Sequence, residues 1–124
     1  MAWNLQSDRP IYTQILEQIQ TRIISGCYKP GEKLPSVREL AAEANVNPNT
    51  MQKAFAELER SGLISTQRTS GRTVTEDIGM IEQLKNQLAV SQIQSFIEAM
   101  QQLGYSREEI YNLVTTTLRG GNES

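Results

Sequence analysis

The stretch LPSVRELAAEANVNPNTMQKAFAELERSGLI, residues 34–64, decides the fold. Ser36 is followed three residues later by Glu39, the spacing of a capping box, in which each residue's side chain bonds the other's backbone N–H. The pattern predicts a short helix that buries Val37, Leu40, Ala41 and Ala44. We expect this helix to end near Asn45, a residue type that tolerates the left-handed conformation.

A second helix follows after a tight turn. Asn47 is a good N-cap and Pro48 suits the first helical position, where a missing N–H costs nothing. Met51, Ala54, Phe55 and Leu58 recur at the spacing of one helical face, and Ser61-Gly62 closes the helix. Two short helices joined in this way predict a helix-turn-helix.

The flanking sequence completes the predicted domain. Before it, Pro10 starts a helix in which isoleucines recur every fourth residue, and Gly26 ends it. After it, β-branched segments at 63–67 and 72–75 flank a polar tip that contains glycine, which predicts a β-hairpin. The predicted fold is therefore mainly α with a small β-hairpin: a winged helix-turn-helix over residues 1–77.

Such a motif binds DNA by placing its second helix in the major groove, with the start of that helix toward the bases. Asn and Gln can pair with adenine, and Lys can reach guanine or phosphate. The candidate reading residues are Asn47, Asn49, Thr50, Gln52 and Lys53. The hairpin tip, Arg68 to Arg72, can place arginines on the backbone or in the minor groove.

Residues 78–124 are predicted to form a helical segment with a frayed tail from Gly120 to Ser124. Its first helix is longer than most globular helices, and Ser106 and Glu109 form a second capping box that opens the last one. Two such helices expose apolar surface unless a partner covers it, so we predict a dimerisation arm. The alternative is that both helices fold back on the winged domain. The candidate dimerisation residues are Ile81, Leu84, Leu88, Phe96, Ile97, Met100, Leu103, Ile110, Leu113 and Val114.

Composition restricts the chemistry. The chain has no His and one Cys, so it cannot supply a His/Cys zinc site or a Ser-His or Cys-His nucleophilic pair. We expect no enzyme activity, metal or cofactor, although chemistry based on carboxylate, Lys or Tyr stays open. No signal peptide or membrane span is expected, which predicts a cytoplasmic protein.

The charge of the chain is unevenly distributed. The net charge is −2, but residues 22–72 carry eight basic and five acidic side chains, a local excess of positive charge that permits DNA binding.

The segments LPSVRELA (34–41), VNPNT (46–50) and LERSGLI (58–64) resemble the DNA-binding domain of GntR-family repressors, over about Pro10 to Val74. The resemblance implies that Arg38 contacts DNA, and Ser36 beside it joins the candidate contacts. It also implies that the wing at Ser70, Gly71 and Arg72 approaches the minor groove. Many members have Arg where this chain has Pro48, and Gly-x-Gly in the wing. The Asn-Pro-Asn-Thr form and the short C-terminal part resemble the small YtrA-type branch.

The resemblance implies a homodimeric repressor that binds a pseudo-palindromic operator. The short C-terminal part is too small to enclose the large metabolite pocket of bigger branches, which leaves the existence of a small-molecule effector open. The alternative function is a winged-helix module for protein–protein contact, which the acidic net charge favours.

Overall fold

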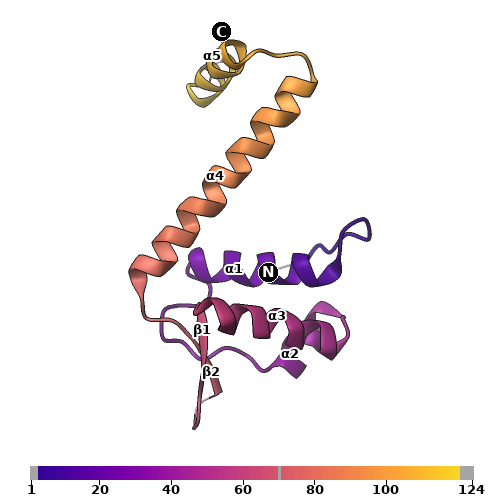
Figure 1. Ribbon diagram of the computed structural model, residues 1–124, viewed down its shortest axis with the longest axis vertical. Coiled ribbons are helices and arrows are strands. Elements are labelled where there is room, and N and C mark those ends of the chain that lie inside the picture. The colour runs from indigo at the N-terminus through magenta and orange to yellow at the C-terminus, as the bar shows by residue number, and fades with distance from the viewer. Residues whose placement is uncertain (1–2, 70, 121–124) are drawn as a thin grey trace. The chain divides into compact units, whose positions relative to one another are not determined.

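A computed structural model describes residues 3–69 and 71–120 of the chain, which divides into two compact units, residues 1–84 and 85–124. Figure 1 shows the elements in chain order. They are α1 (Ile11–Ile24), α2 (Val37–Ala44), α3 (Pro48–Ser61), β1 (Ile64–Gln67), β2 (Gly71–Val74), α4 (Ile78–Gln102) and α5 (Arg107–Leu118). The predicted fold class, mainly α with one small hairpin, is confirmed.

The predicted caps form as the local sequence dictates. At the start of α2, the Ser36 hydroxyl accepts the Glu39 N–H at 3.0 Å, and the Glu39 carboxylate accepts the Ser36 N–H at 2.9 Å. Asn45 ends α2 in the left-handed region, with φ 59°. At the start of α3, the Asn47 side chain accepts the Asn49 N–H at 2.8 Å. These bonds satisfy donors that a helix terminus otherwise leaves free.

One expected boundary differs by a residue. Pro10 has ψ 130° and lies outside α1 as its N-cap, so the helix begins at Ile11 rather than at the proline. The carbonyl of Pro10 still accepts a bond from the Gln14 N–H, at 3.3 Å. Gly26 follows the helix with φ 87°, as the sequence predicts.

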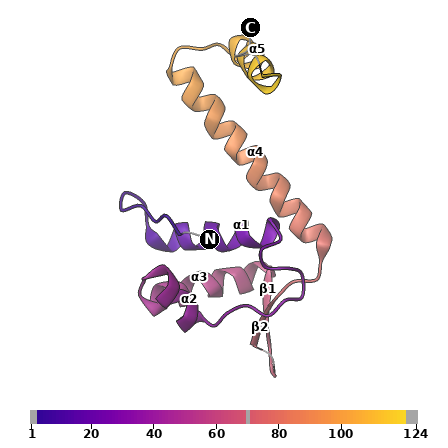
Figure 2. The same ribbon diagram turned by 180° about the vertical axis from the view of Figure 1, so that it is seen from behind.

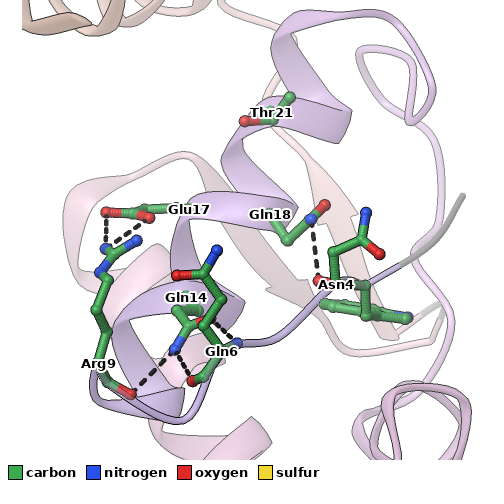
Figure 3. A pocket seen from close by; sticks show the side chains of 8 residues that line it. Asn4, Gln6, Arg9, Gln14, Glu17, Gln18 and Thr21 are labelled. Carbon is green, nitrogen blue, oxygen red and sulfur yellow. Dashed lines mark hydrogen bonds and ion pairs between the residues drawn. The ribbon is translucent and has the colours of Figure 1, made fainter.

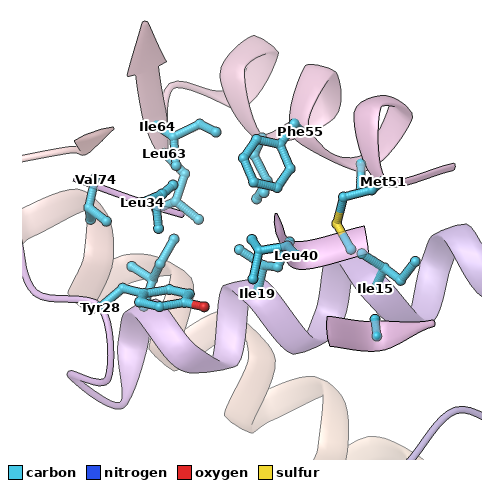
Figure 4. Packing of buried hydrophobic residues seen from close by; sticks show 14 of the residues in the cluster. Ile15, Ile19, Tyr28, Leu34, Leu40, Met51, Phe55, Leu63, Ile64 and Val74 are labelled. Atoms are coloured by element: carbon cyan, nitrogen blue, oxygen red, sulfur yellow. The ribbon is translucent and has the colours of Figure 1, made fainter. Parts of the chain in front are cut away.

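The core of the first unit lies between α1 and α3, with α2 and the hairpin at its sides. Figure 4 shows Ile15 and Ile19 of α1 facing Met51 and Phe55 of α3, with Leu40 of α2 between them. The fully buried set also includes Ile23, Leu58, Ile64 and Val74. Removing such side chains from water is the main stabilising contribution to a small domain of this kind.

The hairpin is antiparallel, and its register pairs Ile64 with Val74 and Gln67 with Gly71. The chain before α2 extends this sheet on the β2 side, because the Leu34 N–H donates to the Arg72 carbonyl at 2.9 Å. The Val74 N–H in turn donates to the Glu32 carbonyl at 2.9 Å. Figure 2 shows the hairpin projecting away from the three helices, which is the arrangement of a wing.

The first turns of α4 belong to the first unit. Asp77 caps the helix by accepting the Met80 N–H at 3.1 Å. Ile81 is buried in the core, with Met80 and Leu84 packed against that core. These contacts anchor the start of α4 on the winged domain.

The second unit contains the rest of α4, a turn through Gly104 at φ 103°, and α5. Ser106 and Glu109 form the second predicted capping box, with bonds of 3.2 and 2.8 Å. Of the tail predicted to fray, residues 121–124 lie outside the described residues. Among the helices that the structure describes, none is long and apolar enough to cross a membrane.

Candidate nucleic-acid interface

The start of α3 presents a polar, exposed surface. Asn49, Gln52 and Lys53 are exposed, as is the cap Asn47, while Thr50 is half-buried. The buried face of the same helix holds Met51, Ala54, Phe55 and Leu58 in the core, which fixes the direction of the polar face. The predicted reading residues therefore share one end of one helix, where the side chains of Asn49, Gln52 and Lys53 are exposed.

Lys53 has a partner that the sequence reasoning did not identify. Its Nζ lies 4.6 Å from the centre of the Tyr12 ring, at the start of α1, which is within the range of a cation–π contact. No local pattern indicates the pair, since α1 and α3 meet only in the folded domain.

The start of α2 and the wing lie close together. A groove of about 300 Å³ is lined by Lys33, Leu34, Pro35, Ser36, Glu39, Gly71 and Arg72. Two parts of the predicted DNA site, Ser36 and Gly71, thus meet at one groove. The Ser36 hydroxyl is engaged in its cap, whereas the Arg38 side chain is exposed one residue beyond the start of α2. The hydrogen bonds from Ser36 lower the pKa of the Glu39 carboxyl and keep it ionised.

The wing divides into a tip and an anchored base. Arg68 and Thr69 at the tip are exposed, and Ser70 lies outside the described residues. At the base, the Arg72 Nε lies 3.3 Å from a carboxylate oxygen of Glu59 on α3, and the Thr66 hydroxyl donates to the same carboxylate. The Thr66 hydrogen bond, helped by Arg72, lowers the pKa of Glu59. The guanidinium of Arg72 also lies 5.3 Å from the centre of the Phe55 ring.

Arg60, which is also on α3, is not among the predicted DNA contacts. Its guanidinium pairs with Glu57 one turn earlier on α3, and that carboxylate raises the pKa of Arg60.

The segment before α1 is bound to the domain by buried polar groups. The Gln14 amide accepts the Gln6 N–H at 2.7 Å and donates to the carbonyls of Gln6 and Arg9 (Figure 3). These residues line a polar pocket of about 240 Å³, together with the Arg9–Glu17 ion pair. Most of these polar groups bond to one another, so they hold the segment before α1 against the domain.

Trp3 connects the same N-terminal segment to α2. Its indole N–H donates to the Glu43 carboxylate at 2.8 Å, and its ring lies 4.1 Å from the guanidinium of Arg22. Arg22 is 3% exposed and also donates to the Tyr28 hydroxyl at 2.8 Å. A charge buried to this extent requires partners, and this cluster supplies them. No group of His, Cys, Asp and Glu suited to a metal ion occurs in the described part of the chain.

Comparison with known proteins identifies the family. The family model described as "Bacterial regulatory proteins, gntR family" matches residues 11–74, just over half of the chain. The chain belongs to the GntR family.

Relatives of the GntR-family chain are named as transcription regulators. The chain is 40% identical over 116 residues to the uncharacterized HTH-type transcriptional regulator YhcF of Bacillus subtilis, covering 94% of this chain and 96% of YhcF. It is 45% identical over 89 residues to the HTH-type transcriptional repressor YtrA of the same organism, covering 67% and 68% of the two chains. The predicted resemblance to the family and its YtrA-type members is confirmed.

Solved structures of similar fold include a member of the same family and a DNA-binding domain in complex with its operator. A GntR-family transcriptional regulator from Listeria monocytogenes superposes with a TM-score of 0.82 at 45% identity, over 90% of this chain and 98% of its own. The DNA-binding domain of AraR in complex with operator ORX1 superposes at 0.51 and 29% identity, over 60% of this chain and 92% of its own.

The second unit of the GntR-family chain contains an apolar groove of about 440 Å³ between α4 and α5. Four predicted dimerisation residues line it: Phe96, Ile97, Ile110 and Val114. The groove is also lined by residues that are not among the predicted dimerisation residues: Ile93, Arg107, Tyr111, Thr115 and Leu118. Ile93, Tyr111 and Leu118 are three or four residues from predicted positions and so share a helix face with them, whereas Thr115 does not have this spacing from any of them.

The other predicted dimerisation residues are distributed differently. Leu103 and Leu113 are exposed, and Leu88 and Met100 are half-buried. Ile81 is buried in the core of the first unit and Leu84 packs against it, so neither presents an open apolar surface. A helical repeat alone cannot separate positions that face the winged domain from those that face outward.

Proposed function

We propose that the chain is a homodimeric, sequence-specific DNA-binding regulator that represses transcription in the cytoplasm by occupying a pseudo-palindromic operator. The exposed polar start of α3, beside a projecting hairpin with Arg68 at its tip, carries the proposal. Asn47, Asn49, Thr50 and Gln52 read bases in the major groove, with Lys53 on base or phosphate. Arg38 and Ser36 contact the backbone. The wing tip, Arg68 to Gly71, approaches the neighbouring minor groove.

The proposed homodimer uses the apolar groove of the second unit. Ile93, Phe96 and Tyr111 place large apolar side chains at the surface, with exposed fractions of 56%, 44% and 70%. A soluble protein rarely leaves such a contiguous apolar surface in water. A second copy of the chain covers it by presenting the same surface about a two-fold axis.

The test is a fluorescence-anisotropy titration with DNA from the region upstream of the chain's own gene, and with a scrambled duplex, over a series of salt concentrations. Specific binding commonly exceeds non-specific binding by about 10³-fold or more. We expect a gap of this order and a steep loss of affinity with salt, because phosphate contacts release counterions.

Two variants separate the contact classes. Arg38→Ala should weaken binding to both duplexes and flatten the salt slope by about 0.9 for each lost phosphate contact. Gln52→Ala should change the base preference and leave the salt slope close to that of the wild type. Equal affinity of both variants and the wild type for every duplex would show that the assigned face is wrong.

A second candidate function is a winged-helix module for protein–protein contact, which the net charge of −2 favours. This candidate predicts no retention of DNA even at low salt, together with recovery of a protein partner in a pull-down.

A further inference from the structure

A single carboxylate on α3 holds both strands of the wing. Glu59 accepts the hydroxyl of Thr66 on β1 and pairs with the Nε of Arg72 on β2 at 3.3 Å. Thr66 and Arg72 are directly opposite each other in the register of the hairpin. Side chains at opposed positions point to the same face of a two-stranded sheet, so Glu59 engages that face from one side.

Arg72 joins this contact to two other parts of the domain. Its guanidinium lies over the ring of Phe55, one helical turn before Glu59 and fully buried in the core. Its carbonyl accepts the N–H of Leu34, in the segment that leads into α2. Glu59 and Arg72 are 30% and 27% exposed, so their pair is partly shielded from water and salt. Arg72 therefore connects the wing to the reading helix and to the entry of α2.

We propose that Glu59 is a positioning residue that sets the wing against α3, and that Arg72 serves DNA recognition through its pair with Glu59. The inference rests on the proposed function, in which α3 and the wing tip enter neighbouring grooves. Their separation must then match the spacing of those grooves. We call Glu59, Thr66 and Arg72 the wing latch.

The wing latch and simple electrostatics predict opposite changes in DNA affinity when the Glu59 carboxylate is removed. Removing a carboxylate from a DNA-binding domain makes the domain more positive, and long-range attraction to phosphate then increases. Loss of the wing latch instead lets the wing move relative to α3 and weakens binding to the operator. The two effects can thus be told apart from the direction of the change.

The experiment compares Glu59→Ala with Glu57→Ala in the anisotropy titration. Glu57 is a matched control because it lies on the same helix, carries the same charge and pairs with Arg60 rather than with the wing. We expect Glu59→Ala to lose about tenfold in operator affinity, a size common for residues in one coupled network, and to narrow the gap to the scrambled duplex. Glu57→Ala should bind as tightly as the wild type or more tightly. Equal operator affinity of the two variants would overturn the proposal.

A second measurement requires no DNA. Amide hydrogen exchange of β1 and β2 should be about tenfold faster in Glu59→Ala than in Glu57→Ala, because the hairpin opens locally more often. Thr66→Val, which removes only the hydroxyl, should show a smaller change of the same kind, and it replaces Glu59→Ala if that variant does not fold. Should the wild type fail to distinguish operator from scrambled DNA, the proposed function fails. The exchange rates of β1 and β2 then test the wing latch by themselves. Faster exchange in Glu59→Ala than in Glu57→Ala supports the wing latch, and equal exchange in the two variants overturns it.

Discussion

Replacing Phe96 by Ala should disrupt the proposed dimer without unfolding the chain. Phe96 lines the apolar groove and is 44% exposed in a single copy. An aromatic side chain can bury roughly 200 Å², so about 90 Å² remains for a partner to cover. At about 25 cal/mol per Å² this is about 2 kcal/mol for each protomer.

A two-fold dimer covers this side chain twice, so the loss is about 4 kcal/mol for the dimer. That energy corresponds to roughly a thousandfold increase in the dissociation constant. Sedimentation velocity over a range of protein concentrations measures the constant directly. Circular dichroism of the variant checks that the helices remain formed.

The matched control is Ile78→Ala. Ile78 is 55% exposed at the start of α4 and lies in the first unit, whereas the groove is lined by residues of the second unit. It should leave self-association unchanged. A Phe96→Ala chain that dimerises as tightly as the wild type would refute the assignment of the groove, and a monomeric wild type would refute the homodimer itself.

Three further predictions concern the stability of the winged domain. Trp3→Phe keeps a ring beside Arg22 but removes the indole hydrogen bond to Glu43. Urea unfolding should show a free energy of unfolding that is lower by about 1.5–3 kcal/mol, the range for hydrogen bonds to charged groups. Asn47→Ala removes the cap of α3 and should cost about 1 kcal/mol in the same assay, with weaker operator binding in anisotropy. The pKa of Glu39 is lowered in the folded state, so its stabilising contribution is present above its ordinary pKa of 4.5 and is lost as the pH falls through the lower folded value. The difference in unfolding free energy between wild type and Glu39→Ala, measured from pH 7 to pH 3, should therefore shrink below about pH 4.5.

The elements that could be predicted from sequence are those that local spacing determines. Both capping boxes depend on a serine and a glutamate three residues apart, a relation that holds before any tertiary contact exists. Asn45 and Gly62 mark helix ends because few other residues adopt the left-handed region without strain. The helix-turn-helix and the hairpin follow from such signals.

The contacts that could not be predicted join segments that only packing brings together. The resemblance implies a DNA contact for Arg72, whereas the pair of Arg72 with Glu59 depends on how the hairpin lies on α3. Likewise, Tyr12 meets Lys53 because α1 packs on α3. The helical repeat placed Ile81 on an apolar face correctly, but the repeat carries no information on whether that face meets the winged domain or a partner.

The acidic net charge of the chain and the proposed DNA binding are compatible for a structural reason. Glu43, Glu57 and Glu59 each lie within 4 Å of an arginine in the same unit, and the Glu39 carboxylate is held at the positive end of α2. The field of a close ion pair declines faster with distance than that of a lone charge, and salt screens what remains. The cations Arg38, Lys53 and Arg68 are exposed, and none of them forms an ion pair among residues 3–69 and 71–120. The local field at the docking face is therefore set by these side chains, and the sum over the whole sequence says little about it.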